Sequence, residues 1–274
     1  SAPVYGYHDT GFGHSSVKPY QTKRNMAEKI SVSPSGEKFP LPQEQDYKAE
    51  FEKLQKRVAE ERAKNREIVV VMGLGFVGAV MAAIVADSTD KQGNPGKFVI
   101  GMQRPSVRSF WKIPLLNRGI SPVKAEDPEV DPMIARCVVE KKTLVATYTY
   151  DVLKLADTVV VDVQCDYLKE SLGNVRNGHT DMEALEASIA VIADHIPASA
   201  LVLIETTVAP GTTEQVAYPI MKKAFKKRGI KSDPLLAHSY ERVMPGRDYV
   251  ASIRDFWRVC SGINEEAKKR VVKF

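Results

Sequence analysis

The stretch from Ile68 to Gly78, IVVVMGLGFVG, decides the fold of this chain. Its first four residues are all β-branched and apolar, which is typical of a strand buried on both faces of a sheet. The Ala-rich segment 76–87 follows and predicts a helix. A strand that passes through a glycine-rich turn into a helix is the opening unit of many nucleotide-binding α/β domains.

The turn itself has the pattern Gly73-x-Gly75-x-x-Gly78. The first glycine permits the tight turn, the second lets the backbone approach a pyrophosphate, and the third lets helix and strand pack closely. The free amides at the helix start, including those of Phe76 and Val77, would then bind the phosphates together with the helix dipole. The alternative is a glycine-containing turn with no ligand, but the strand–turn–helix context favours dinucleotide binding.

Apolar runs continue to alternate with amphipathic stretches along the chain. We expect strands at 68–71, 98–101, 144–146, 158–163, 201–205, 235–239 and 257–260. We expect helices at 45–66, 76–87, 152–156, 181–195 and 211–227. This alternation predicts the fold class: an α/β, doubly wound, Rossmann-like parallel sheet with helices on both faces.

The expected organisation has four parts. Residues 1–44 are rich in Gly, Pro and Ser and form either a flexible arm or an arm that packs its aromatic side chains on a neighbouring subunit. A helix at 45–66 leads into the dinucleotide-binding domain at 67–264, and residues 265–274 begin a further helix.

The composition excludes several classes of protein. The chain has 274 residues, 43% of them hydrophobic and 27% charged, so it can bury a core. Its net charge of +5 suits anionic ligands, but no basic run with interleaved aromatics indicates nucleic acid. No apolar stretch is long enough for a bilayer, and the three cysteines have neither disulfide-framework nor zinc spacing. We therefore expect a cytoplasmic protein with no metal site.

The end of the second expected strand departs from the usual fingerprint. An acidic residue normally follows that strand and holds the ribose hydroxyls of NAD. Here Gln103 and Arg104 stand at this place, with Arg108 nearby. Gln103 can still hydrogen-bond a hydroxyl, while Arg104 and Arg108 are either solvated surface charges or partners for a 2′-phosphate. The sequence predicts NAD as the cofactor, with NADP possible.

Three further segments carry a resemblance to a known family. Residues 204–214, IETTVAPGTTE, are similar to a strand-and-turn segment of the UDP-glucose/UDP-N-acetylmannosamine dehydrogenases. Residues 240–247, YERVMPGR, resemble a second signature of that family, and Leu116-Asn117-x-Gly119 resembles its Leu-Asn-x-Gly motif. The resemblance extends from residue 67 to about 264 and identifies the chain with the N-terminal NAD-binding domain of nucleotide-sugar dehydrogenases.

The resemblance implies an oxidoreductase that converts the C6 hydroxyl of a UDP-sugar to a carboxylate with NAD, in polysaccharide biosynthesis. It also implies that Glu241 takes part in water activation or thioester hydrolysis. Thr207 ends an expected strand at the edge where open α/β sheets bind ligands, so we place it with Glu241 and the cofactor. Val163 begins a turn that lines the cofactor site in the family, although Val163-Gln164-Cys165-Asp166 departs from the family's usual residues there.

The family's nucleophile is a cysteine that traps the aldehyde, and no matching cysteine follows Cys260. Cys165 lies in the expected site but has no neighbouring His or Lys to lower its pKa, and Cys137 and Cys260 are expected in the core. We therefore expect a fragment of a homo-oligomeric enzyme that binds cofactor and does not complete the reaction. The alternatives are a non-catalytic dinucleotide-binding module or another Rossmann dehydrogenase, and the two Pro-Gly signatures argue against the latter.

Overall fold

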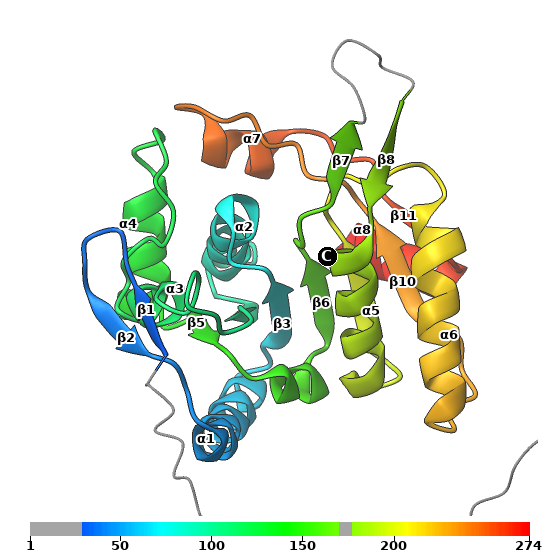
Figure 1. Ribbon diagram of the computed structural model, residues 1–274, viewed down its shortest axis with the longest axis horizontal. Helices are drawn as coiled ribbons and strands as arrows, with labels where there is room; N and C mark the ends of the chain where they lie inside the picture. The colour runs from blue at the N-terminus through cyan, green and yellow to red at the C-terminus, as the bar shows by residue number, and fades with distance from the viewer. Residues whose placement is uncertain (1–28, 170–176) are drawn as a thin grey trace, which may run out of the picture.

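A seven-stranded sheet forms the centre of the computed structural model, which describes residues 29–169 and 177–274 (Figure 1). In spatial order its strands are β11 (Ser261–Gly262), β10 (Leu235–His238), β9 (Leu201–Ile204), β6 (Thr158–Val161), β3 (Glu67–Met72), β4 (Lys97–Met102) and β5 (Leu144–Thr147). The strands from β10 to β5 run parallel, and β11 pairs antiparallel with β10. The expected doubly wound sheet is therefore confirmed, with one short antiparallel strand at its edge.

Helices cover both faces of this sheet. One face packs against α2 (Phe76–Asp87), α3 (Lys112–Asn117), α4 (Val130–Ala135), the π-helix η1 (Arg136–Glu140), α7 (Tyr249–Asp255) and α8 (Glu265–Lys273). The other face packs against α1 (Glu44–Ala63), the 3₁₀-helix η2 (Tyr150–Leu155), α5 (Glu183–His195), the π-helix η3 (Thr213–Ala217) and α6 (Tyr218–Lys227).

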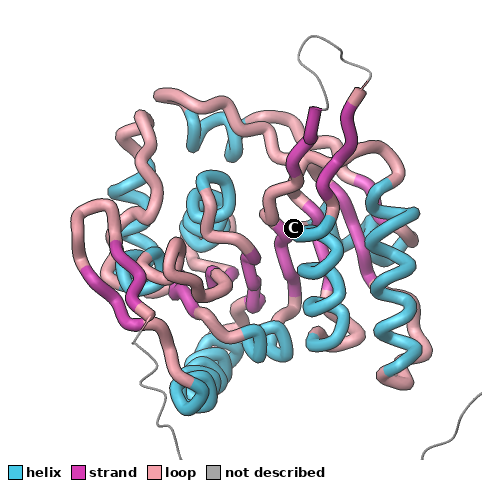
Figure 2. The backbone as a smooth tube through the Cα atoms, in the orientation of Figure 1, coloured by secondary structure: helices cyan, strands magenta, loops and turns pink. Residues whose placement is uncertain are grey.

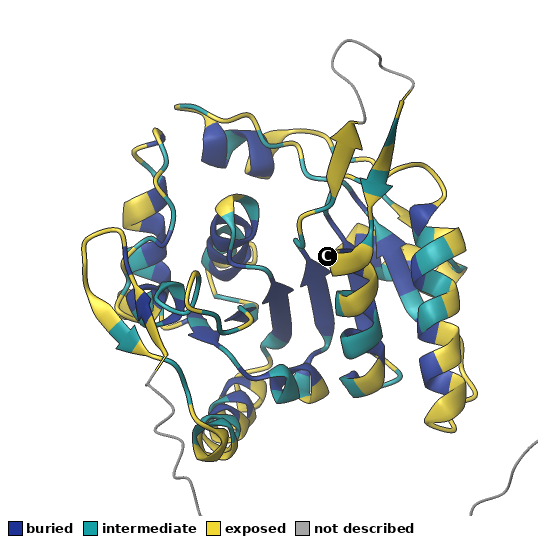
Figure 3. Ribbon diagram, viewed as in Figure 1, coloured by how far each residue is buried: buried dark blue, intermediate teal, exposed yellow. Residues whose placement is uncertain are grey.

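Strand β3 shows why the sequence folds in this way. Val69 and Val71 pack into one hydrophobic cluster, while Ile68 and Val70 pack into the other, and all four are fully buried. Each such side chain contributes roughly 1.5–3 kcal/mol by burial. Figure 3 shows the central strands buried and the outward faces of α5 and α6 largely exposed. A run of β-branched residues without polar alternation thus predicted a central strand correctly.

The order of the strands places a ligand site. From β3 the chain proceeds through β4 and β5 on one side, and then through β6, β9 and β10 on the other. Open α/β sheets bind ligands at such a switch point, beyond the carboxyl ends of the strands. Loops gather at this edge, which is uppermost in Figure 2, while α1 lies beneath the opposite edge.

The part of the expected arm that the structure describes contains a hairpin that the composition did not predict. Strands β1 (Ile30–Val32) and β2 (Lys38–Pro40) pair antiparallel. Arg118 donates two hydrogen bonds to the Glu37 carboxylate, at 2.9 and 2.7 Å, and its guanidinium lies over the Phe39 ring. The hairpin is thereby fixed to the end of α3. The rest of the arm, residues 1–28, lies outside the described residues.

Two other segments differ from expectation. A second hairpin, β7 (Asp166–Lys169) and β8 (Gly178–Asp181), lies between β6 and α5 where no strand was expected. The expected strand at 257–260 is wrong: this segment is a loop, Trp257 is 94% exposed, and the strand that pairs with β10 is β11. Cys260 is accordingly half-buried in that loop rather than in a core strand. Apolar residue types alone misplaced the strand, because Trp257 and Val259 are exposed.

Candidate cofactor and catalytic site

The glycine turn joins β3 to α2 as expected. The amide of Gly73 donates to the carbonyl oxygen of Met102 at 2.9 Å. Gly73 has a φ of +99°, and an added Cβ would lie 2.5 Å from the carbonyl oxygen of Asp162, so only glycine fits. An added Cβ at Gly75 would meet nothing within 4 Å. Backbone is therefore exposed to open space at Gly75, the position where a pyrophosphate would approach.

Helix α2 supplies free donors beside this open space. Gly75 is its N-cap residue, and the first helical hydrogen bond runs from the Ala79 amide to the Gly75 carbonyl oxygen. The amides of Phe76, Val77 and Gly78 precede that bond and have no acceptor within the helix. These donors and the helix dipole fit a pyrophosphate, so the residues present suit a dinucleotide.

Two side chains fix the turn from the β4 side. The amide of Leu74 donates to Oε1 of Gln103 at 2.9 Å, and Nζ of Lys112 donates to the Leu74 carbonyl oxygen at 3.0 Å. Burial lowers the pKa of Lys112. The sequence did not indicate Lys112, because its role depends on how α3 packs beside the turn. Gln103, expected to bind ribose, thus also anchors the turn through its oxygen.

A cavity of about 450 Å³, here the β4-side cavity, lies between the ends of β3, β4 and β6 and the start of α5. The expected cofactor-binding residues that line it are Gly73, Gly75, Gln103, Arg104 and Val163. Arg108 does not line it, and lies exposed further along the same loop.

A cavity of about 340 Å³, here the β9-side cavity, continues from it. The expected residues that line it are Gly75, Phe76, Val77, Val163, Thr207 and Glu241. The hydroxyl of Thr207 donates to Oε2 of Glu241 at 3.1 Å. Gly75 and Val163 line both cavities, so the glycine turn lies between the two cavities.

A buried acid cluster lies beneath the β9-side cavity. Asp162 follows β6 and Glu205 follows β9, on neighbouring strands that pair Val161 with Ile204. Arg258 forms an ion pair with the fully buried Glu205. Burial, and then the negative charge of Glu205, raise the pKa of Asp162 well above its usual value. Burial also raises the pKa of Glu205, against the opposing effect of Arg258. Because Glu205 has a cation in contact with it and Asp162 has none among the described residues, we expect Asp162 rather than Glu205 to hold a proton.

The sequence did not indicate this cluster. In the described parts of the chain, four buried side-chain atoms have no hydrogen-bond partner, and three of them belong to Asp162, Glu205 and Arg258. Residues 162 and 205 each directly follow an apolar strand, and that placement was the available signal. The contribution of Arg258 could not be foreseen, because its segment was expected to be a strand.

Neither Cys165 nor Cys137 offers an activated thiolate. Burial raises the pKa of Cys165, and the charges of Asp181 and Asp166 add to that shift. Cys137 is buried on η1 as expected, and burial raises its pKa to about 12. A thiol needs a lowered pKa to act as a nucleophile near neutral pH. Within residues 29–169 and 177–274, no three His, Cys, Asp or Glu side chains are placed to hold a metal ion.

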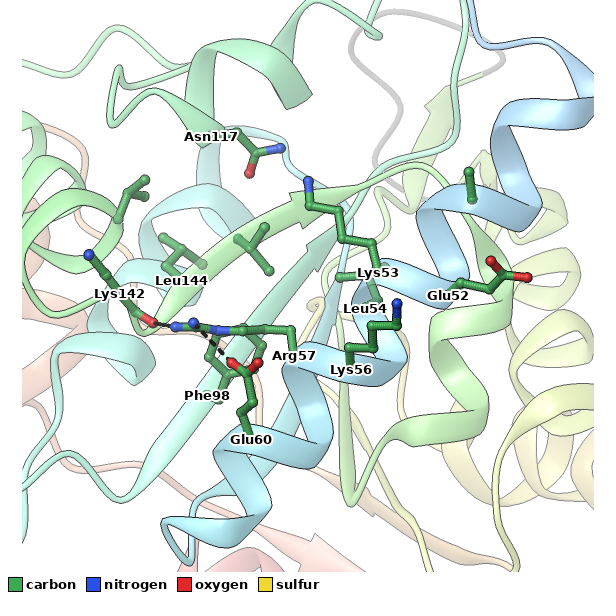
Figure 4. Close-up of a pocket in the computed structure, with 13 residues that line it drawn as sticks. Glu52, Lys53, Leu54, Lys56, Arg57, Glu60, Phe98, Asn117, Lys142 and Leu144 are labelled. Carbon is green, nitrogen blue, oxygen red and sulfur yellow. Dashed lines mark hydrogen bonds and ion pairs between the residues drawn. The ribbon is translucent and has the colours of Figure 1, made fainter.

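A larger cavity, of about 690 Å³, lies elsewhere (Figure 4). It is bounded by α1 and the amino-terminal parts of β4 and β5. Arg57 lies over the Phe98 ring and donates to the carbonyl oxygen of Lys142 at 2.9 Å. None of the residues expected to bind the cofactor lines this cavity. The size of a cavity therefore does not identify the cofactor site. The expected residues line the two smaller cavities at the carboxyl edge of the sheet, and these mark the site.

Fold and site together define a dinucleotide-binding domain of the dehydrogenase type, with the glycine turn at the switch point of the sheet. Residues 67–273 match the model of the UDP-glucose/GDP-mannose dehydrogenase family, NAD binding domain. The chain belongs to this family, which confirms the expected relationship and indicates NAD as the cofactor. None of the helices in the described residues has the length and apolar character that a membrane crossing requires.

Individual relatives agree with this assignment. The chain is 29% identical over 199 residues to a UDP-N-acetyl-D-mannosamine dehydrogenase of Pyrococcus horikoshii, covering 73% of this chain and 42% of that protein. The crystal structure of an NDP-N-acetyl-D-galactosaminuronic acid dehydrogenase from Methanosarcina mazei matches with a TM-score of 0.66 and 31% identity. That match covers 80% of this chain and 43% of the other. The chain therefore spans about two fifths of the length of these relatives.

Proposed function

We propose that this chain is the cofactor-binding part of an NAD-dependent nucleotide-sugar 6-dehydrogenase, which oxidises the C6 hydroxyl of a UDP-sugar to a carboxylate. The observation that carries the proposal is the glycine turn, with open space at Gly75 between two continuous cavities. The Thr207–Glu241 pair lies in the second of these cavities, next to the turn. The names of the relatives support a sugar nucleotide as the substrate.

Each cavity has a separate task in this proposal. The β4-side cavity takes the adenosine half of the cofactor, and the α2 amides take its pyrophosphate. When bound, NAD supplies the hydride acceptor. The β9-side cavity then receives the reacting end of the sugar beside Glu241.

Glu241 is proposed to accept a proton from the water that releases the carboxylate product. The Thr207 hydroxyl donates to Oε2 of this carboxylate and so fixes its orientation, while the other oxygen remains able to accept a proton. The covalent nucleophile is proposed to come from a part of the enzyme outside this chain. Three further properties of the enzyme stay predictions: its homo-oligomeric state, its cytoplasmic location and its role in polysaccharide biosynthesis. The domain boundary at residue 264 is also still a prediction.

The test is calorimetric titration of NAD into the wild-type chain and the variant Gly75→Val. The Cβ of valine would enter the open space above the turn, so the fold should persist while NAD affinity falls at least about tenfold. Gly96→Val is the matched control, because Gly96 also faces open space but precedes β4 at the opposite edge. Unchanged NAD affinity in folded Gly75→Val would contradict the proposal.

A further inference from the structure

The β4-side cavity has no charged acceptor for ribose hydroxyls. Of its lining residues only Asp162 is acidic, and that buried carboxyl group follows the end of β6, where the nearby negative charge of Glu205 raises its pKa. At the end of β4, where an acidic residue would hold both hydroxyls of the adenosine ribose, the structure has Gln103 and Arg104. The cavity therefore lacks the group that both favours NAD and repels a 2′-phosphate.

The orientation of Gln103 strengthens this difference. Its Oε1 is occupied by the Leu74 amide at 2.9 Å, and this bond fixes which end of the side-chain amide is the oxygen. The end that remains is the NH₂ group, a hydrogen-bond donor. A donor suits a phosphate oxygen at least as well as a ribose hydroxyl, and a carboxylate would suit only the hydroxyl.

Arg104 supplies a positive charge at the same place. It lines the cavity and forms no ion pair with any residue of the described chain. Its charge reaches Tyr150 on the other side of the cavity, where it opposes the rise that burial causes in the Tyr150 pKa. An unpaired guanidinium can bind a phosphate through two parallel hydrogen bonds.

The loop that carries Arg104 is internally fixed. The Ser109 hydroxyl donates to the Arg104 carbonyl oxygen at 3.1 Å, and it lies 2.8 Å from the Ser106 hydroxyl. Arg108 lies exposed on the same loop and does not line the cavity. Arg104 therefore lies on a fixed loop directly after the end of β4, where the usual fingerprint has an acidic residue for the ribose hydroxyls.

We propose that the site binds the 2′-phosphorylated dinucleotide NADP at least as tightly as NAD, with Arg104 as the residue that determines this specificity. The inference rests on the proposed function, because it requires a dinucleotide in the glycine turn. It has two physical reasons. The 2′-phosphate of NADP would gain a charge-assisted contact with Arg104, and no carboxylate beside Arg104 would repel that phosphate.

The experiment is calorimetric titration of NAD and NADP into three variants and the wild type. Arg104→Ala is expected to weaken NADP about tenfold and to change NAD less than about twofold, since only NADP has the phosphate. Gln103→Glu keeps the oxygen that holds Leu74 but adds a carboxylate, so it is expected to weaken NADP about tenfold and leave NAD unchanged or tighter. Lys91→Ala removes an exposed charge at the opposite edge and should change neither affinity.

The outcomes separate the two proposals. If the wild type binds NAD but binds NADP tenfold more weakly, or if Arg104→Ala weakens both equally, the specificity inference is wrong and the proposed function stands. If neither dinucleotide binds, the proposed function itself is wrong. NADP affinity that falls more steeply with salt than NAD affinity would give independent support, because a charge contact is screened.

Discussion

The two sides of the carboxyl edge are chemically opposite, although they adjoin the same glycine turn. The β4 side presents Arg104 and the side-chain amide of Gln103, whereas the β9 side presents the Glu241 carboxylate. The Asp162 carboxyl group lines both cavities, and the fully buried Glu205 lies on the neighbouring strand end. The first arrangement attracts an anion by charge and by donors. The second places the Glu241 carboxylate, which accepts a hydrogen bond from the Thr207 hydroxyl, in the β9-side cavity. Under the proposed function, the two sides would separate cofactor binding from chemistry along a single edge of the sheet.

Gly78 lies where the two sides meet, and its replacement gives the largest expected effect. A Cβ there would overlap the Gly73 carbonyl oxygen and lie 3.1 Å from Cβ of Asp162. The Gly73 carbonyl oxygen belongs to the backbone, so it cannot move away from the new methyl group easily. We therefore expect Gly78→Ala to lower the free energy of unfolding by about 4 kcal/mol. Urea denaturation measures this quantity.

Gly75→Ala is the matched control, since the new methyl group would enter open space and should change stability by less than about 1 kcal/mol. Equal stability of the two alanine variants would contradict the close approach of Gly78 to the Gly73 carbonyl oxygen.

The ion pair of the β9 side gives the next largest effect. Arg258→Met keeps much of the side-chain volume but leaves the fully buried Glu205 carboxylate without its cation. Breaking a buried pair in this way costs about 3 kcal/mol, which denaturation in urea would show. Adding Glu205→Gln to Arg258→Met should recover most of the loss, because no charge is then left unpaired. If the double variant is as unstable as the single one, packing rather than charge explains the effect.

The same contrast explains how much the sequence could predict. The β4 side was largely predictable, because the turn, Gln103 and Arg104 are continuous with one strand–turn–helix pattern and follow its strands directly. Lys112 was missed there, since nothing local shows that its ammonium group reaches the Leu74 carbonyl oxygen.

The β9 side was predictable only where a resemblance supplied the residues. Thr207 and Glu241 are 34 positions apart and meet because β9 and β10 are neighbours. The cluster of Asp162, Glu205 and Arg258 brings together three distant segments, and one of these was assigned the wrong secondary structure. Long-range contacts of this kind leave no periodic signal in the sequence. The segment that contains Arg258 was expected to be a strand because of apolar residues such as Trp257, which is in fact exposed.

The most gradual expected effect is a pH dependence that arises from Asp162. Burial and Glu205 hold the pKa of Asp162 above its unfolded value, with Glu241 acting in the same direction, Arg258 against it, and Tyr249 nearby. The folded state therefore binds a proton that the unfolded state releases above roughly pH 4. Stability is fully present below that pH and falls as the pH rises towards the raised pKa, by at most about 1.4 kcal/mol per pH unit.

Asp162→Asn keeps a donor towards Glu205 but cannot ionise, so it should lack this part of the pH dependence. Urea denaturation between pH 5 and 8 gives the free energy of unfolding of each protein as a function of pH. Subtracting one curve from the other removes the contribution of the titratable groups that both proteins contain. We expect the stability of Asp162→Asn relative to the wild type to increase steadily with pH. Asp166→Asn, which removes an exposed carboxylate on β7, should remain parallel to the wild type. A constant difference between Asp162→Asn and the wild type would mean that Asp162 is ionised throughout this range, and the proton would then have to be assigned to Glu205.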